Sequence, residues 1–246
     1  MSERARISAI THGDLPFHNP LSAARVDEAL GHAGLRPGAR VLDVGCGAGE
    51  LLIRAAERFG ATGAGIDDAA VQIEEARRRA AARVPAAGLE FELADARGED
   101  RLGGSFDLVA CIGSMHAVEG GLPALAGRLA PGGRVLIGDG FWRREPGQPY
   151  LDALGATADE LPDLPALIRG SDPAGLEATW AAVTTDEEWD RYEWTLIDNG
   201  LRWAREHADD PLAPEVAAWA RRGRERVLTP GGRDTLGFAL VLYVAQ

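Results

Sequence analysis

A cluster of three glycines lies where a strand is expected to turn into a helix. Gly45, Gly47 and Gly49 follow the mostly apolar run Val41–Val44, and an apolar repeat at helical spacing begins after Glu50. Glycine lacks a Cβ atom, so it lets such a turn take positive φ and approach a ligand closely, while the N–H groups of the first helical turn stay free to donate. The pattern predicts a site for a flat or an anionic ligand, although a bare Gly-x-Gly also occurs in tight turns that bind nothing.

The spacing of these glycines separates two classes of ligand. A dinucleotide site reads G-x-G-x-x-G or G-x-G-x-x-A, in which the third small residue lets the helix pack closely and lets its N-terminus face a pyrophosphate. Glu50 occupies that third position here. A carboxylate in the first helical turn would repel a pyrophosphate and obstruct its approach, so the loop favours a positively charged or zwitterionic ligand.

Carboxylates follow at the ends of the next expected strands. Thr62–Asp67 is typical of a short strand, and Asp67 follows the glycines at about the twenty-residue distance at which nucleotide-binding folds place a carboxylate for the ribose hydroxyls. Asp68 is expected to cap the next helix. Leu89–Ala94 alternates as a third strand and runs into Asp95. Strand four is expected at Phe106–Ile112, and a helix end, a turn and strand five are expected at Leu129–Asp139.

The glycine loop resembles motif I of the class I S-adenosylmethionine-dependent methyltransferases, which reads hydrophobic-Asp-hydrophobic-Gly-x-Gly-x-Gly. Asp43 and the three glycines match every position of that motif, and the later strand ends follow in the family's order. The resemblance implies S-adenosyl-L-methionine as the cofactor and S-adenosyl-L-homocysteine as its product. It also implies that Asp95 accepts the exocyclic amine of adenine. The residues expected to contact the cofactor are Asp43, Gly45, Cys46, Gly47, Gly49, Asp67, Asp68, Asp95, Ala96, Cys111, Ile112 and Gly113.

The second half of the chain has a different composition. All six tryptophans lie after residue 141, and a capping-box pattern from Thr185 to Glu188 predicts a long helix that runs to about His207. A second helix is expected after Pro211. These two helices would form an insertion between a sixth strand at Leu176–Thr184 and a closing strand at Leu236–Val244.

This arrangement is similar to that of the bacterial YjhP-like small-molecule methyltransferases, whose helical insertion also lies late in the chain. Ile137–Trp142 and Glu188–Glu193 carry this further resemblance. The fold class expected is α/β: a Rossmann-like, doubly wound, seven-stranded, mostly parallel sheet with an antiparallel last strand and a helical insertion before that strand.

The length of 246 residues is compatible with one α/β domain that carries an insertion. The first 18 residues are expected to be irregular, and Asn19–Pro20 is expected to begin a helix. The expected division is an N-terminal cap segment and helix (1–38), a cofactor-binding core (39–140), a connection from strand five to strand six (141–184), a helical insertion (185–228) and a closing strand (229–246).

The charge balance argues against two kinds of partner. There are 26 basic and 38 acidic residues, and the formal net charge is -12. Because such a field repels phosphate groups, neither nucleic acid nor an anionic membrane surface is expected as a partner. The longest apolar run, Leu236–Ala245, is too short to cross a bilayer, and no signal-peptide pattern is present, so a soluble cytoplasmic protein is expected.

Several reaction types need residues that the chain lacks or does not group suitably. All basic residues other than histidine are arginines, so Schiff-base chemistry, a Walker lysine and a Tyr-x-x-x-Lys pair are excluded. Cys46 and Cys111 form no disulfide framework, and the five histidines show no metal-site spacing. No bound metal is therefore expected.

The residues around the fourth and fifth strand ends are candidates for the acceptor side. His116 follows strand four and is the candidate general base for an acceptor that must lose a proton. Asp139, Trp142 and Tyr150 are candidates for lining the acceptor pocket. Structural roles compete with each assignment: His116 could cap a helix or touch adenine, Asp139 could cap a turn, and the two aromatic side chains could pack beneath the insertion.

The expected function is methyl transfer from S-adenosylmethionine to an oxygen, nitrogen or carbon nucleophile of a small molecule. Two alternatives stay open. An NAD(P)-dependent oxidoreductase would share the glycines and Asp67, and a non-catalytic sensor would keep the cofactor pocket but close the acceptor side.

Overall fold

The computed structural model describes residues 3–13, 15–95, 104–170 and 175–245. Contacts within the chain divide it into two compact units, which we call the helical unit and the sheet unit. The helical unit comprises Met1–Leu21, Phe141–Asp163 and Thr184–Gly237, and the sheet unit comprises Ser22–Gly140, Leu164–Val183 and Phe238–Gln246.

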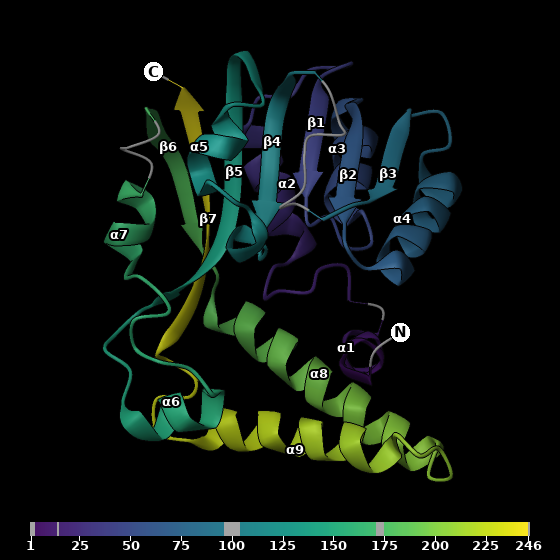
Figure 1. Cartoon of the computed structure of the whole chain (residues 1–246), viewed down its shortest axis with the longest axis vertical. Coiled ribbons are helices and arrows are strands. Elements are labelled where there is room, and N and C mark those ends of the chain that lie inside the picture. The colour runs from purple at the N-terminus through teal and green to yellow at the C-terminus, as the bar shows by residue number, and fades with distance from the viewer. Residues whose placement is uncertain (1–2, 14, 96–103, 171–174, 246) are drawn as a thin grey trace. The chain divides into compact units, whose positions relative to one another are not determined.

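The sheet unit is built on one seven-stranded sheet with the strand order β3-β2-β1-β4-β5-β7-β6 (Figure 1). Its strands are β1 (Arg40–Val44), β2 (Thr62–Asp67), β3 (Leu89–Leu93), β4 (Phe106–Ile112), β5 (Leu129–Trp142), β6 (Leu176–Val183) and β7 (Leu236–Ala245). The last two residues of β5 and the first two of β7 belong to the helical unit.

The strand directions confirm the predicted fold class. β1 runs parallel to both β2 and β4, β2 runs parallel to β3, and β4 runs parallel to β5. β7 pairs with β6 in the antiparallel sense. Because the chain proceeds from β1 outward to β3 and then returns to β4 on the other side of β1, the switch point lies between β1 and β4, at the edge where their carboxyl ends meet.

Helices α3 (Glu50–Phe59) and α4 (Ala70–Arg83) pack on the sheet through buried apolar residues. α3 contacts β1 and β2, α4 contacts β2 and β3, and α2 (Ala23–His32) contacts α3. The buried side of α2 is Val26, Ala29 and Leu30, as its sequence pattern predicts. The unit also contains α5 (Gly121–Ala126), α7 (Leu164–Arg169) and the 3-10 turn Met115–Ala117.

The helical unit contains the predicted insertion as a pair of long helices. α8 (Asp186–Glu206) and α9 (Ala213–Leu228) pack along each other, and α6 (Gln148–Leu154) contacts α9 (Figure 1). The capping box at the start of α8 is confirmed, because the Thr185 side chain accepts from the Glu188 N–H while the Glu188 side chain accepts from the Thr185 N–H. Arg226 of α9 and Glu193 of α8 form an ion pair at 2.8 Å.

The prediction that the first 18 residues are irregular is wrong, because Glu3–His12 forms helix α1. Polar contacts to α8, rather than an apolar stripe, hold this helix. The Asn199 side chain donates to the Thr11 carbonyl at 3.0 Å, and His12 Nε2 lies 3.0 Å from the Tyr192 hydroxyl. Because hydrophobic periodicity is the main helix signal in a sequence, a helix held in this way leaves little of that signal.

Two further boundaries differ from the prediction. α2 begins at Ala23 rather than at Asn19–Pro20, because Ser22 is its N-cap and accepts from the Arg25 N–H at 3.2 Å. β5 begins at Leu129, where a helix end and a turn were expected. Its pairing with β4 jumps from Leu129 to Arg134, so the intervening segment forms an irregularity within the strand.

Candidate functional site

Two of the three loop glycines are required by contacts within the protein. All three have positive φ: 74° at Gly45, 51° at Gly47 and 77° at Gly49. A Cβ atom at Gly45 would lie 2.3 Å from Ser114 Oγ, and one at Gly49 would lie 2.6 Å from Cε1 of Phe91. No side chain fits at either position, so these glycines let the loop pack between β3 and the end of β4.

Gly47 differs from its two neighbours. A Cβ atom there would meet no atom within 4 Å, so this part of the backbone faces open space. Glycine is therefore not required at position 47 by crowding inside the protein. An exposed backbone with positive φ at a strand-to-helix turn is what a closely approaching ligand requires.

Asp67 links the glycine loop to the end of β2 by a hydrogen bond. Its Oδ2 accepts from the Gly47 N–H and its Oδ1 accepts from the Ala69 N–H, each at 2.9 Å. A carboxylate has about four acceptor positions, so these two bonds leave capacity for ribose hydroxyls. The predicted role of Asp67 in binding ribose thus remains a prediction, and the structure adds a second role in shaping the loop.

Asp43 is a buried carboxyl group beneath the loop, with 3% of its surface exposed. Burial raises its pKa to about 7, and the negative charge of Asp67 adds to that rise. Its side chain forms no hydrogen bond or ion pair with the part of the chain that the structure describes. A buried carboxyl group without a partner is costly, so the site favours a ligand that brings a positive charge or a hydrogen-bond donor.

The two cysteines lie among these carboxyl groups but are not reactive. Burial raises the pKa of the Cys46 thiol, and the charges of Asp43 and Asp67 add to the rise. Burial likewise raises the pKa of the Cys111 thiol to about 12. Since the thiolate is the reactive form of cysteine, neither residue is suited to act as a nucleophile or a metal ligand.

The ends of β4 and β5 place the other predicted residues at the same edge. The Gly113 N–H, next to Ile112, donates to the Gly138 carbonyl at 2.7 Å. Burial raises the pKa of Asp139, while the Gly140 N–H, which donates to it at 2.8 Å, and the charge of His116 oppose this rise. His116 is exposed, in the turn Met115–Ala117, and lies within electrostatic range of Asp139.

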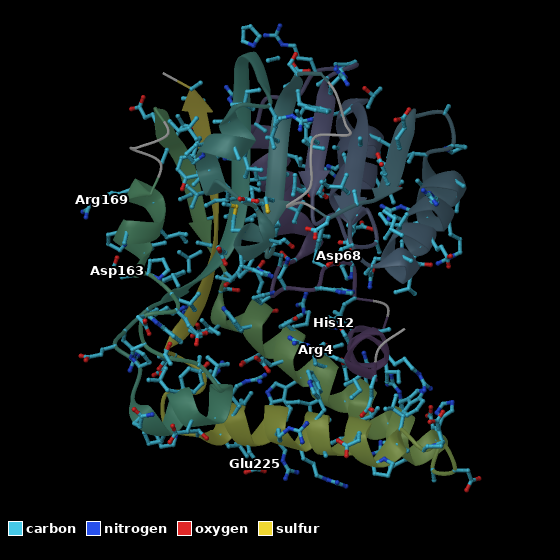
Figure 2. The ribbon with its side chains drawn as sticks, viewed as in Figure 1. Arg4, His12, Asp68, Asp163, Arg169 and Glu225 are labelled. Carbon is cyan, nitrogen blue, oxygen red and sulfur yellow. The ribbon has the colours of Figure 1, made fainter. Side chains whose placement is uncertain are left out.

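The structure tests one prediction made for the carboxylates that follow β2 and β3. Asp68 is exposed at the carboxyl edge of the sheet (Figure 2) and does not cap α4, so that prediction is wrong. Asp67 supplies the local hydrogen bond instead, through the Ala69 N–H. Asp95 is exposed just beyond β3, and Ala96 lies outside the described residues.

Trp142 and Tyr150 belong to the helical unit and are buried there, with 7% and 2% of their surfaces exposed. They pack together with Leu151 in a small apolar cluster. The Trp142 Nε1–H donates to the Ala158 carbonyl at 2.8 Å, and burial raises the pKa of Tyr150 to about 12. These contacts explain both aromatic side chains as core residues, and their substrate-lining role remains a prediction.

The interpretation of Glu50 requires a correction. The Glu50 side chain is 6% exposed, and its carboxylate forms ion pairs with Arg54 at 3.2 Å and with Arg83 at 2.6 Å. The two arginines compensate its charge, so Glu50 does not present a free negative charge to the loop. The glycine spacing, rather than repulsion by Glu50, therefore disfavours a dinucleotide.

Ser114 lies at the site although the sequence analysis assigned it no role. Its side chain packs against Gly45 and so bounds the glycine loop on the side of β4. The signal was present in the sequence, since Ser114 lies two residues before His116 in the segment that follows β4.

The described residues offer neither a metal-binding cluster nor a membrane-spanning helix. Residues 3–13, 15–95, 104–170 and 175–245 contain no group of three histidine, cysteine, aspartate or glutamate side chains arranged to hold a metal ion. Within those same ranges, no helix has the length and apolar character needed to cross a membrane.

Comparison with known proteins agrees with this site. Residues 41–133 match the methyltransferase domain family. The chain is 32% identical over 247 residues to YjhP, an uncharacterized protein of Escherichia coli (strain K12), and the match covers 98% of each protein. It is 36% identical over 116 residues to 27-O-demethylrifamycin SV methyltransferase of Amycolatopsis mediterranei (strain S699), which covers 46% of this chain and 43% of that protein.

A solved structure shows the same likeness. The S-adenosylmethionine-dependent methyltransferase of Thiobacillus denitrificans, solved in complex with S-adenosyl-L-homocysteine, is 32% identical to this chain. The structural match has a TM-score of 0.88 and covers 98% of each chain. The chain therefore belongs to the S-adenosylmethionine-dependent methyltransferases, in the family that includes YjhP.

Proposed function

We propose that this enzyme transfers the methyl group of S-adenosylmethionine to an oxygen, nitrogen or carbon nucleophile of a small molecule. The observation that carries the proposal is the open backbone at Gly47 beside two carboxyl groups, Asp43 and Asp67. The cofactor supplies an activated methyl group on a positively charged sulfonium.

The residues of the glycine loop bind the cofactor in this proposal. The Gly47 backbone allows the ligand to approach, and Asp67 accepts hydrogen bonds from the ribose hydroxyls. Asp43 lies beneath the loop, where a cationic ligand offsets the cost of burying its charge. Asp95 accepts from the adenine amine at the end of β3.

The protein contributes to the reaction mainly by positioning, since the methyl group leaves a neutral thioether. Alignment of this kind supplies up to about 7 to 11 kcal/mol in well-oriented systems. His116 is the group proposed to take the proton of an acceptor hydroxyl or ammonium, and Asp139, within electrostatic range of it, is proposed to line the acceptor pocket. The acceptor class is supported by the match to a methyltransferase named for a rifamycin substrate.

The proposal is tested by calorimetric titration of S-adenosyl-L-homocysteine into matched glycine variants. Gly47→Ala places a methyl group in the open space at the loop. Gly88→Ala is the control, because Gly88 also has positive φ (64°) and also has no atom within 4 Å of a Cβ. We expect Gly47→Ala to weaken binding about tenfold or more, because the methyl group takes the space of the ligand, and Gly88→Ala to leave it unchanged.

Equal affinities for both variants would overturn the assignment of the loop. A titration with NADH under the same conditions distinguishes the oxidoreductase alternative, for which NADH binds and S-adenosyl-L-homocysteine does not. A labelled-methyl assay against pooled metabolites then separates an enzyme from a sensor, because a sensor binds the cofactor without turnover.

A further inference from the structure

The helical unit contains a cavity of about 340 Å³, and its lining residues are none of those proposed to bind the cofactor. That volume lies at the lower end of the range found for small-molecule pockets, about 300 to 1,000 Å³. It is lined by Glu3, Arg4, Ile7, Ser8 and His12 of α1 and by Trp219 of α9.

Three of these side chains form a polar row along one face of α1. Arg4, Ser8 and His12 are four residues apart, a spacing that stacks side chains on the same side of a helix. Figure 2 labels Arg4 and His12, which come from the first and the last turn of α1. The Ser8 hydroxyl lies 3.2 Å from His12 Nδ1, which links the middle of the row to its end.

Two oppositely charged side chains line this cavity, and the described residues offer a partner to neither of them. Neither Arg4 nor Glu3 forms an ion pair or a side-chain hydrogen bond with any residue between 3 and 245 that the structure describes. Arg6 of the same helix differs, because it pairs with Asp210 at 3.5 Å. A ligand that carries both a carboxylate and an ammonium group would satisfy both free charges at once.

Two of the other lining residues, Ile7 and Trp219, offer contacts for an apolar part of a ligand. Ile7 offers an aliphatic surface on α1, and Trp219 offers a large aromatic surface on α9. Aromatic side chains attract apolar and aromatic groups through burial and ring stacking.

We propose that this cavity binds a small zwitterion with an apolar side chain, that is, a molecule like an apolar α-amino acid. Its carboxylate binds Arg4 and the Ser8 hydroxyl, its ammonium group binds Glu3, and its side chain packs against Ile7 and Trp219. The cavity lies wholly within the helical unit, and the proposal does not depend on methyl transfer.

Three probes test each charge separately in ligand-observed NMR titrations of the full chain without cofactor. L-Phenylalanine carries both charges, 3-phenylpropionate lacks the ammonium group, and phenethylamine lacks the carboxylate. We expect saturable binding of L-phenylalanine, with each of the other two probes weaker by about threefold to tenfold, as for partly exposed ion pairs. Equal binding of all three probes, or no saturable binding of any, would overturn the proposal.

Charge-removing variants give the second arm of the test. Arg4→Gln should weaken the binding of L-phenylalanine and leave the binding of phenethylamine unchanged. Glu3→Gln should weaken the binding of L-phenylalanine and leave the binding of 3-phenylpropionate unchanged. Arg6→Gln is the matched control, since it removes a guanidinium from the same helix outside the cavity. If Arg6→Gln weakens the binding of L-phenylalanine as much as Arg4→Gln does, the effect comes from net charge and the proposed binding site is wrong.

Discussion

The sheet unit and the helical unit position their polar groups in different ways. In the sheet unit, glycines and carboxylates at strand ends form the site, and backbone amides fix them, as when Asp67 accepts from Gly47 and Ala69. In the helical unit, side chains from separate segments fix one another, as when Tyr192 contacts both His12 and the His18 carbonyl. The first arrangement depends on local backbone geometry, and the second depends on which helices meet.

The largest expected difference between the units concerns glycines with positive φ. Gly45→Ala introduces a Cβ 2.3 Å from Ser114 Oγ, whereas Gly155→Ala in the helical unit meets no atom within 4 Å. Backbone strain and crowding together should lower the free energy of unfolding by about 4 kcal/mol at position 45, against about 1 kcal/mol from strain alone at position 155. Urea unfolding of the full chain measures both values, and similar losses at the two positions would show that the loop is not closely packed.

The second expected difference concerns pH and Asp43. Its pKa of about 7 in the folded protein exceeds its ordinary value of 3.8, so the folded state holds the proton more tightly than the unfolded state. The stabilisation is complete below pH 3.8 and is lost as the pH rises through 7. Relative to Asp43→Asn, the wild-type protein should lose about 3 kcal/mol between pH 4 and pH 7, because each pKa unit corresponds to about 1.4 kcal/mol. Unfolding curves that run parallel for the two proteins over this range would contradict the assignment.

A smaller difference concerns the hydroxyl groups of two tyrosines, Tyr192 in the helical unit and Tyr243 in the sheet unit. Tyr192→Phe removes a hydroxyl that lies 3.0 Å from His12 Nε2 and also donates to the His18 carbonyl. Tyr243→Phe in the sheet unit removes one bond, to the Leu167 carbonyl at 3.2 Å. We expect losses of about 2 and about 1 kcal/mol in the free energy of unfolding, since Tyr192→Phe also leaves Nε2 of the buried His12 without its partner. A larger loss for Tyr243→Phe would mean that side-chain contacts do not hold α1.

The smallest expected effect is the pH response of His12, which runs opposite to that of Asp43. Burial lowers the pKa of His12, and its hydrogen bond to the Ser8 carbonyl only partly opposes this. The contribution to stability is complete above the ordinary value of 6.5 and is lost as the pH falls through the lowered pKa. When the pH falls below 6.5, the free energy of unfolding should therefore drop more in the wild type than in His12→Gln. Urea unfolding measures both drops, and equal drops would contradict the lowered pKa of His12.

The same contrast explains what could be predicted from the sequence. The mostly parallel sheet, the turn at the loop glycines and the place of Asp67 at a strand end were predictable. Parallel strands bring their carboxyl ends to one edge, and glycines mark a turn whose backbone takes positive φ. The helix α1 was not predictable, because Thr11 and His12 are held by Asn199 and Tyr192, far along the chain. The partners of Glu50 escaped prediction for the same reason, since Arg83 comes from another helix.

A crystal structure of this chain grown with S-adenosyl-L-homocysteine would test the proposed cofactor site directly. We expect electron density for the ligand against the Gly47 backbone, with its ribose hydroxyls on Asp67 and its charged end toward Asp43. A well-ordered loop with the ligand bound elsewhere, or with no ligand at saturating concentration, would contradict the proposed site.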